Sequence, residues 1–292
     1  MGQTKKLRGH LKSPYAYYLM LPALLVYALL FVLPALSGLL LSFFNVKSFK
    51  LSTITFAAVL RNPYFSIAIK NTLLFAAVTT LGKVIFGMAL ALLVNQRFHG
   101  VNYMRTVFFL PAVLNNVAVG LVFRSMMHPS GLINQTLSAM GLDMLMHNWL
   151  TDAKIAIFSC AFVEIWKWTG YTMVIFLAGL QSIDKTYYEA AQLDGATYWQ
   201  QLRSVTIPLI MPALNNAVVI SVVGGLKVFD IVQSLTNGGP GNATSVFGTL
   251  IYSSFSSGSY GRGCAASMIL TFFVLLIALP TNRFISRKEV EV

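Results

Sequence analysis

The sequence predicts an all-α integral membrane protein with six transmembrane helices and a pair of short polar helices between the fourth and the fifth. The first observation is composition, because 56% of the 292 residues are hydrophobic and only 10% are charged, a balance that soluble domains do not show. The second is a set of six apolar segments, each near the length of about 20 residues that a bilayer requires. The third is a polar stretch at 182–206. We interpret the chain as one membrane domain.

The six predicted spans follow one another along the chain and are separated by turn-forming stretches such as "TNGGPGNAT". They are expected at 17–43, 72–94, 106–123, 155–180, 207–235 and 264–284. Four basic residues precede the first apolar run: Lys5, Lys6, Arg8 and Lys12. That run is too long for a cleaved secretory signal, so we expect an uncleaved first span.

The net charge of +12 is interpreted as a topology signal. Lys and Arg lie mainly at the edges of apolar runs and do not cluster with aromatic residues, so no nucleic-acid partner is expected. They are modestly more frequent on the side of the termini, which places the tails 1–16 and 285–292 and the polar stretch in the cytoplasm. Cys160 and Cys264 lie inside apolar runs, and neither a disulfide framework nor a metal site is suggested.

The polar stretch has the pattern of two short helices joined by a glycine. Ser182 or Asp184 can cap a first helix, and Gly195 follows where a left-handed residue is expected. A second helix can begin near Thr197 and continue to Pro208, which ends it or introduces the next span. By physics alone this pair either lies on the lipid head groups, anchored by Tyr and Trp, or docks onto another protein.

The spacing within this stretch resembles a known signature. Glu189, Ala190 and Ala191 are followed by three residues and Gly195, and nine residues later by "VTIP", which ends at Pro208. This pattern is similar to the signature loop of permease subunits of ATP-binding cassette importers, from which it departs by Val205 and Ile207. The stretches "FFLPAV", "WKWTGYTMVIFLAGLQSI", "KVFD" and "TNGGPG" also resemble the carbohydrate branch of that family, which includes maltose-type and glycerol-3-phosphate-type permeases.

The resemblance implies a type I importer permease fold and a set of partners. In the family, this cytoplasmic helix inserts into a cleft of an ATPase subunit, so the residues implied in ATPase coupling are Glu189, Ala190, Ala191, Asp194, Gly195 and Pro208. The implied partners are a second homologous permease subunit, an ATPase dimer that binds ATP and Mg, an extracytoplasmic solute-binding protein and a sugar. The implied location is the cytoplasmic membrane of a bacterium or archaeon.

Polar residues inside the predicted spans are candidates for a substrate pathway, since ionisable groups in a bilayer usually face a cavity or a partner. The candidates are Glu164, Lys167, Trp168, Tyr171, Asn216, Lys227 and Asp230. Aromatic faces beside donors and acceptors suit a sugar. Alternatively, Glu164 with Lys167 and Lys227 with Asp230 neutralise each other along their own helices and seal a bundle.

Two further features of the predicted spans leave alternatives open. Lys83 stands alone in the second span, and Asn115 or Asn116 is a candidate partner. Gly224 and Gly225 allow either a kink or close packing of helices.

No phosphate-binding Gly-x-x-x-x-Gly-Lys-[Ser/Thr] run occurs in the sequence, and no catalytic or metal-ligating constellation is apparent. We therefore expect the chain to be a permease and not an enzyme, with no cofactor of its own and with ATP hydrolysis on a separate subunit. A glycerol-3-phosphate-type substrate is one alternative, since Lys167 and Lys227 could meet a phosphate. An ion-coupled secondary carbohydrate carrier is another, but inverted repeats are not detected.

Overall fold

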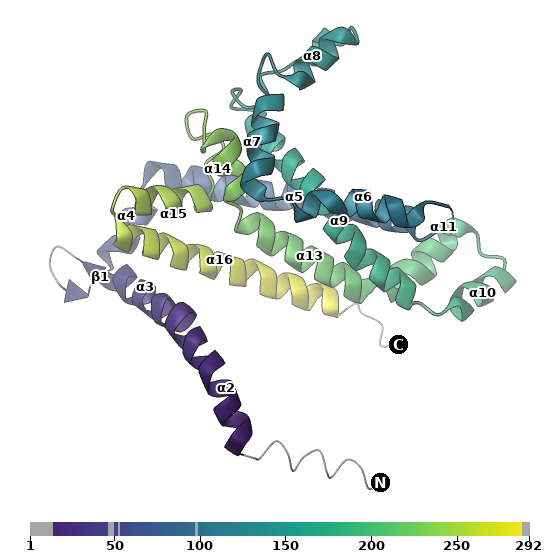
Figure 1. Cartoon of the computed structure of the whole chain (residues 1–292), viewed down its shortest axis with the longest axis horizontal. Coiled ribbons are helices and arrows are strands. Elements are labelled where there is room, and N and C mark those ends of the chain that lie inside the picture. Colours follow the sequence, from purple (N-terminus) through teal and green to yellow (C-terminus); the bar gives the residue numbers. More distant parts are fainter. Residues whose placement is uncertain (1–13, 46–49, 52, 97–98, 288–292) are drawn as a thin grey trace.

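The computed structural model describes residues 14–45, 50–51, 53–96 and 99–287, and most of them are helical. Four long helices run roughly along the length of the main body (Figure 1): α5 (Pro63–Val94), α9 (Ala156–Ser182), α13 (Met211–Leu226) and α16 (Tyr260–Ser286). The predicted tails lie mostly outside the described residues, and so do Lys5, Lys6, Arg8 and Lys12.

Shorter elements connect and flank these helices. The N-terminal part comprises α2 (Pro14–Tyr27), the π-helical turn η1 (Ala28–Val32), α3 (Leu33–Phe43), the strands β1 (Phe44–Asn45) and β2 (Lys50–Leu51), and α4 (Ile54–Leu60). Between α5 and α9 lie α6 (Val101–Val113), α7 (Asn116–Met126), α8 (Leu132–Ala139) and η2 (Asp143–Leu145). Between α9 and α16 lie α10 (Lys185–Leu193), α11 (Tyr198–Gln201), η3 (Leu202–Thr206), α12 (Ile207–Leu209), α14 (Asp230–Thr236) and α15 (Phe247–Ser256).

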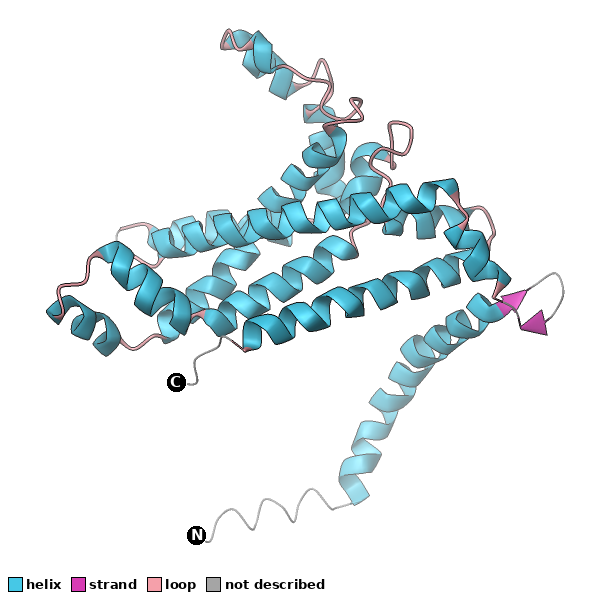
Figure 2. Ribbon diagram, turned by 180° about the vertical axis from the view of Figure 1, so that it is seen from behind, coloured by secondary structure: helices cyan, strands magenta, loops and turns pink. Residues whose placement is uncertain are grey.

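The two ends of the body differ in what they carry. The antiparallel strands β1 and β2 lie near one end, and α10 and α11 lie at the other, as the view from behind shows (Figure 2). The C-terminal end of α16 is at the same end as α10 and α11 (Figure 1). Both predicted polar segments, after the fourth span and after the sixth, are therefore on one side of the bundle.

The predicted second span begins nine residues too late, because α5 starts at Pro63 and not at Thr72. The Oδ1 atom of Asn62 accepts a hydrogen bond from the backbone N–H of Tyr64 at 2.9 Å, and Pro63 occupies the first helical position. An Asn cap followed by Pro is a strong helix start. The cap therefore extends the helix beyond its apolar part.

The predicted third span, 106–123, is not one straight helix. α6 and α7 meet at an angle of 95°. Asn115 caps α7, because its Oδ1 accepts hydrogen bonds from the backbone N–H groups of Val117 and Ala118. An Asn side chain that bonds to the following backbone favours a new helix start over a continued helix.

The predicted fifth span, 207–235, is also interrupted. α12 ends at Leu209, one residue beyond Pro208, and the chain bends by 69° before α13 begins at Met211. A second break separates the end of α13 at Leu226 from the start of α14 at Asp230. This predicted span is therefore three helical pieces, and its polar residues do not lie on a single stripe.

By length and apolar composition, three helices of the described part could cross a membrane, or five if each bent pair counts as one span. The three are Tyr18–Phe43, Pro63–Val94 and Tyr260–Ser286, and the bent pairs are α6 with α7 and α11–α12 with α13. α9 covers the predicted fourth span but carries Glu164 and Lys167 and falls outside this set. The six-span count stays a prediction.

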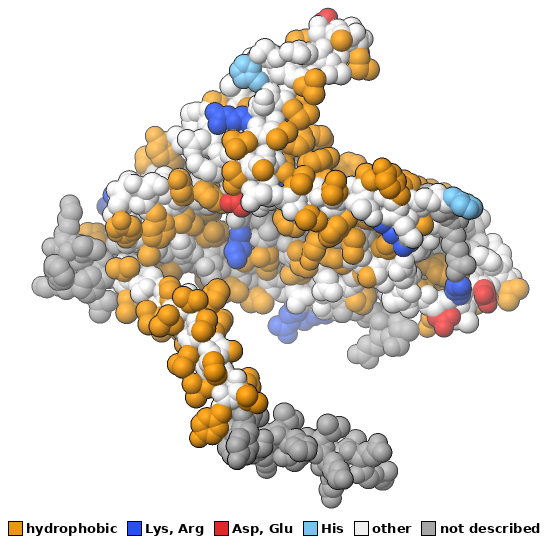
Figure 3. All heavy atoms as spheres, in the orientation of Figure 1, with side chains coloured by type: hydrophobic (Ala, Val, Ile, Leu, Met, Phe, Trp, Pro, Cys, Tyr) orange, Lys and Arg blue, Asp and Glu red, His pale blue; other side chains and the backbone are white. Residues whose placement is uncertain are grey.

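The N-terminal helix stands apart from the body (Figure 1), and hydrophobic side chains cover its visible face (Figure 3). Leu19 and Phe31 are 83% and 64% exposed. Only its last turns pack on the body, where the Ser42 hydroxyl donates to the Met268 sulfur. Such a surface is stable only in lipid or against another apolar protein surface.

Neighbouring glycines of α13 have different surroundings. A Cβ placed on Gly225 would lie 2.7 Å from the Cα atom of Ala76 in α5, whereas one on Gly224 would meet nothing within 4 Å. Close packing therefore explains Gly225, and α13 remains helical through both glycines.

Gly225→Ala is expected to destabilise the protein by about 1–3 kcal/mol, because the added methyl group forces α13 away from α5. The measurement is the thermal unfolding temperature of the purified protein in detergent. Gly224→Ala is the matched control and should leave stability unchanged or slightly higher, since Ala favours the helix by up to about 1 kcal/mol. Equal unfolding temperatures for the two variants would contradict the packing argument.

Candidate functional site

The centre of the bundle contains a buried ion pair between two long helices. The Lys83 Nζ atom of α5 lies 3.6 Å from the Glu164 Oε1 atom of α9, and the two side chains are 4% and 8% exposed. The proposed partners Asn115 and Asn116 are therefore wrong for Lys83. An unpaired charge at this depth is costly, so pairing across helices explains why both residues are tolerated here.

Lys167 does not pair with Glu164 along α9. Its Nζ atom donates to the backbone carbonyl of Ala112 at 3.1 Å and lies 4.3 Å from the ring centre of Trp168. The side chain is 1% exposed. Lys167 thus stabilises the end of α6, where the last carbonyl groups of the helix have no helical hydrogen-bond partner. It does not line the cavity described below.

The second halves of the two broken spans are joined to each other. The Asn116 Nδ2 atom of α7 donates to the Asp230 Oδ2 atom of α14 at 3.1 Å. Asp230 forms no ion pair with Lys227 in the described part of the chain. The alternative in which these two charges neutralise each other is therefore not observed. The two helices also approach closely, because Gly120 of α7 has no side chain and lies against the Ser234 side chain of α14.

These elements enclose a cavity of about 640 Å³, which we call the interior cavity. Its polar lining comes from α5, α7, α9 and the break after α13: Lys83, Asn116, Glu164, Lys227 and Asp230. Its aromatic lining is Trp168, Tyr171 and Phe229. The rings of Trp168 and Tyr171 are perpendicular, with centroids 5.9 Å apart.

The interior cavity brings together five of the seven predicted pathway residues. Lys167 and Asn216 do not line it, and Asn216 is exposed on α13. Sequence reasoning missed Asn116 and Phe229 as lining residues. Phe229 directly precedes Asp230 at a helix break, and no periodic pattern marks such a position.

Donors, acceptors and ring faces in one space can hold a polar organic molecule. Of the lining cations, Lys83 is paired with Glu164. Lys227 is exposed and makes no hydrogen bond or ion pair with any described residue. The interior cavity therefore offers one cation, Lys227, and one carboxylate, Asp230, that form no ion pair with described residues, beside aromatic surfaces.

At one end of the body, residues 185–209 form two short helices joined at Gly195, and we call them the helix pair. Asp184 caps α10, because its Oδ1 accepts from the backbone N–H and the hydroxyl of Thr186 at 2.9 and 3.0 Å. These hydrogen bonds favour the ionised carboxyl and lower the pKa of Asp184. Of the two predicted caps, Asp184 is used, and Ser182 instead donates to the Gly179 carbonyl.

Gly195 sets the angle between the helices. Its φ of +75° is in the left-handed region, and the Ala196 N–H donates to the Ala191 carbonyl at 2.9 Å. The second helix begins as predicted at Thr197, whose N–H donates to the Gln200 Oε1 atom at 2.7 Å. Tyr188 and Thr206 share a hydrogen bond of 3.1 Å that joins α10 to η3.

The helix pair presents its polar and apolar side chains outward. Glu189, Ala190 and Asp194 are exposed, and no described residue bonds to the Glu189 carboxylate. Leu193 and Trp199 are 90% and 74% exposed. The pair is stabilised within itself, and its outer surface is free to contact another molecule.

Broken helices around a polar cavity, together with apolar membrane-length helices, define a membrane transport protein. Residues 83–287 match the family described as binding-protein-dependent transport system inner membrane component, and the chain belongs to this family. It is accordingly a multi-pass inner-membrane protein.

Relatives cover nearly the whole chain. It is 32% identical over 292 residues to the trehalose/maltose transport system permease protein MalF of Thermococcus litoralis, across 96% of this chain and 97% of the relative. It is 31% identical over 276 residues to the lactose transport system permease protein LacF of Rhizobium radiobacter, across 92% of each.

A solved structure has the same fold. A chain of a bacterial alginate ABC transporter, crystallised in complex with an alginate pentasaccharide-bound periplasmic protein, superposes with a TM-score of 0.83 at 28% identity. The match covers 98% of this chain and all of the other. The predicted importer permease fold is confirmed.

Removing one member of the buried ion pair is expected to destabilise the protein by about 3–5 kcal/mol, because the remaining charge is left buried without a partner. Lys83→Met and Glu164→Leu are the single variants, and the two changes together are the double variant. The double variant should regain most of the loss, since it buries no charge. Thermal unfolding in detergent measures the cycle, and additive losses would show that the two residues do not interact.

Proposed function

We propose that this chain is a permease subunit of an ATP-driven, solute-binding-protein-dependent importer of a sugar or oligosaccharide. The observation that carries the proposal is the presence, in one chain of this family, of an aromatic and polar interior cavity and an outward-facing helix pair connected to it by α9. Relatives named for transport of trehalose/maltose and lactose support the substrate class.

The proposed partners would cover the exposed surfaces of this chain, and the likeness to the alginate transporter bound to its periplasmic protein supports them. A second permease subunit would cover the exposed apolar helix α2–α3 and close the pathway. ATPase subunits would dock on the helix pair, through Glu189, Ala190, Ala191, Asp194, Gly195 and Pro208. We expect no enzymatic activity and no cofactor on this chain, with ATP and Mg bound by the ATPase.

The proposed topology places both termini in the cytoplasm. The C-terminal end of α16 lies at the end of the body that carries the helix pair (Figures 1 and 2). The proposed ATPase site and the C-terminus therefore lie on the same side of the membrane. The excess of basic residues on that side supports the cytoplasm.

In the interior cavity, Trp168 and Tyr171 are suited to the C–H faces of a sugar ring, while Glu164, Asp230 and Asn116 are suited to its hydroxyl groups. Lys227 keeps open a second candidate, a phosphorylated small molecule of the glycerol-3-phosphate type, because it is exposed and forms no ion pair with a described residue. An ion-coupled carrier would instead support uptake in ATP-free vesicles that collapses with the ion gradient.

Trp168→Ala is expected to lower transport by the reconstituted importer roughly tenfold, because a ring face of the cavity is lost. Uptake of radiolabelled sugar into proteoliposomes is the measurement. Trp166→Ala is the matched control, since Trp166 packs against Phe123, with centroids 5.0 Å apart, and does not line the cavity. Equal uptake by the two variants would remove Trp168 from the pathway.

Glu189→Lys and Gly195→Val are expected to weaken ATPase recruitment or to uncouple hydrolysis from transport. The first inverts a charge on the docking surface, and the second places a β-branched residue at a left-handed φ, which costs about 1 kcal/mol or more. Co-purification of the ATPase and substrate-stimulated hydrolysis in reconstituted membranes are the measurements.

Gly258→Val is the control for Gly195→Val, because Gly258 has a φ of +72° and likewise open space around it, but lies between α15 and α16. It should recruit the ATPase normally. Normal recruitment and stimulation in both helix-pair variants would instead favour a pair that only lies on lipid, for which Glu189→Lys is harmless next to anionic head groups.

A further inference from the structure

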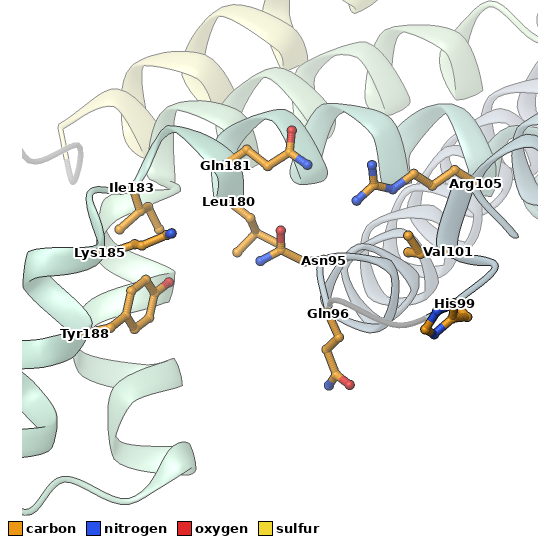
Figure 4. A pocket seen from close by; sticks show the side chains of 10 residues that line it. All are labelled: Asn95, Gln96, His99, Val101, Arg105, Leu180, Gln181, Ile183, Lys185 and Tyr188. Atoms are coloured by element: carbon orange, nitrogen blue, oxygen red, sulfur yellow. The ribbon is translucent and has the colours of Figure 1, made fainter. Parts of the chain in front are cut away.

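A second cavity, of about 720 Å³, lies between the helix pair and the body, and we call it the basic cavity (Figure 4). Four segments meet there: the end of α5, the start of α6, the end of α9 and the start of α10. The polar residues able to contact a ligand in it include Asn95, His99, Arg105, Gln181, Lys185 and Tyr188. None of the residues that line it is Asp or Glu.

The positive charges of this cavity are not neutralised by the described part of the chain. Arg105 donates only to neutral groups, the Val94 carbonyl at 2.8 Å and the Asn102 side-chain oxygen at 3.5 Å. Its Nε atom is buried and has no hydrogen-bond partner. A buried donor without a protein acceptor is costly, and an ordered water or a ligand can satisfy it.

Lys185 adds a second charge from a different helix. It forms no ion pair with a described residue, and the carboxyl group next to it, Asp184, accepts from Thr186. The terminal nitrogen atoms of Arg105 and Lys185 extend into the same space, and the Tyr188 hydroxyl also faces it (Figure 4).

The start of α6 contributes further donors. Its N-cap residue, Gly100, has no side chain to accept from the N–H groups of the first turn, and Val101 in that turn lines the cavity. Free N–H groups at the N-terminus of a helix of 13 residues attract anions. Arg105, Lys185 and the free N–H groups at the start of α6 therefore all favour a negatively charged ligand.

We propose that the basic cavity binds a phosphate-bearing anion, supplied either as the head group of an anionic phospholipid or as a free phosphate compound. The volume lies within the range of small-molecule pockets, and Leu180 and Ile183 provide apolar surface beside the cations. That the cavity faces the cytoplasmic leaflet rests on the proposed function, whereas the binding itself does not.

An anion held here would connect α10 to the body. Lys185 is the first residue of α10, Arg105 belongs to α6, and Gln181 to α9. The bound anion would restrain the movement of the helix pair relative to the long helices. Anion binding would therefore change how strongly ATP hydrolysis is coupled to transport.

The test uses the full chain, purified with its associated subunits in phosphatidylcholine nanodiscs. Phosphatidylglycerol and inorganic phosphate are titrated separately, and bound adducts are counted by native mass spectrometry. Lys185→Gln should weaken binding about tenfold, since a charge-assisted hydrogen bond is lost, and Arg105→Gln should act in the same direction.

Arg283→Gln is the matched control, because Arg283 is an exposed cation near the same end of the body that does not line the cavity. It should bind as the unmodified chain does. If Arg105→Gln fails to fold, Lys185→Gln decides, since its side chain is exposed and makes no hydrogen bond with described residues.

Binding of phosphatidylglycerol alone identifies a lipid site, and competition by inorganic phosphate identifies a soluble ligand; either supports the proposal. Unchanged binding in Lys185→Gln, or equal loss in Lys185→Gln and Arg283→Gln, overturns it in favour of unspecific attraction. Because adducts are counted without transport, failure of ATPase coupling in the Glu189 variant would leave this result unaffected and the two proposals separable.

Discussion

The ion pair between Lys83 and Glu164 joins the two helices, α5 and α9, that make the most extensive contact of the bundle. Both partners are almost completely buried, so their charges are largely removed from water. The attraction offsets desolvation only while the helices keep their register. Since both residues also line the interior cavity, the same interaction positions the walls of that cavity.

A second constraint is that backbone groups freed by helix breaks must be satisfied within a membrane protein. The break between α6 and α7 is capped by Asn115, and Lys167 donates to the Ala112 carbonyl just before it. At the break after α13, the Lys227 N–H donates to the Val223 carbonyl at 3.1 Å. Irregular backbone thus occurs beside the cavity, where polar side chains are available to bond with it.

The sequence predicted the helical membrane fold and the form of the helix pair because these depend on local signals. Apolar runs, the Asp184 cap and the left-handed glycine at Gly195 each act over a few residues. The breaks in the third and fifth predicted spans were missed, because an apolar run has the same composition whether the helix within it is straight or bent. Asn115 was interpreted as a candidate partner of Lys83 and not as a helix cap, because an Asn in a span is suited to either role.

Partners across helices could not be predicted from spacing. Glu164 and Lys167 are three residues apart and can meet along α9, yet Glu164 pairs with Lys83 on another helix, while Lys167 reaches a carbonyl left free at the end of α6. Gly224 and Gly225 look equivalent in sequence, and only the approach of Ala76 distinguishes them. Such choices depend on the distances between helices, which no single-chain pattern contains.

The connection of the helix pair to the long helices explains how one end of the molecule can affect the interior cavity. α9 enters the pair through Ser182 and carries Trp168 fourteen residues earlier, about 21 Å along a continuous helix. The other end of the pair leads through the bend at Ile210 into α13, whose residues form the opposite wall. A displacement of the pair is therefore applied to both walls at once. Under the proposed function, the unbroken helix α9 and the bend before α13 would transmit this displacement to the two walls by different routes.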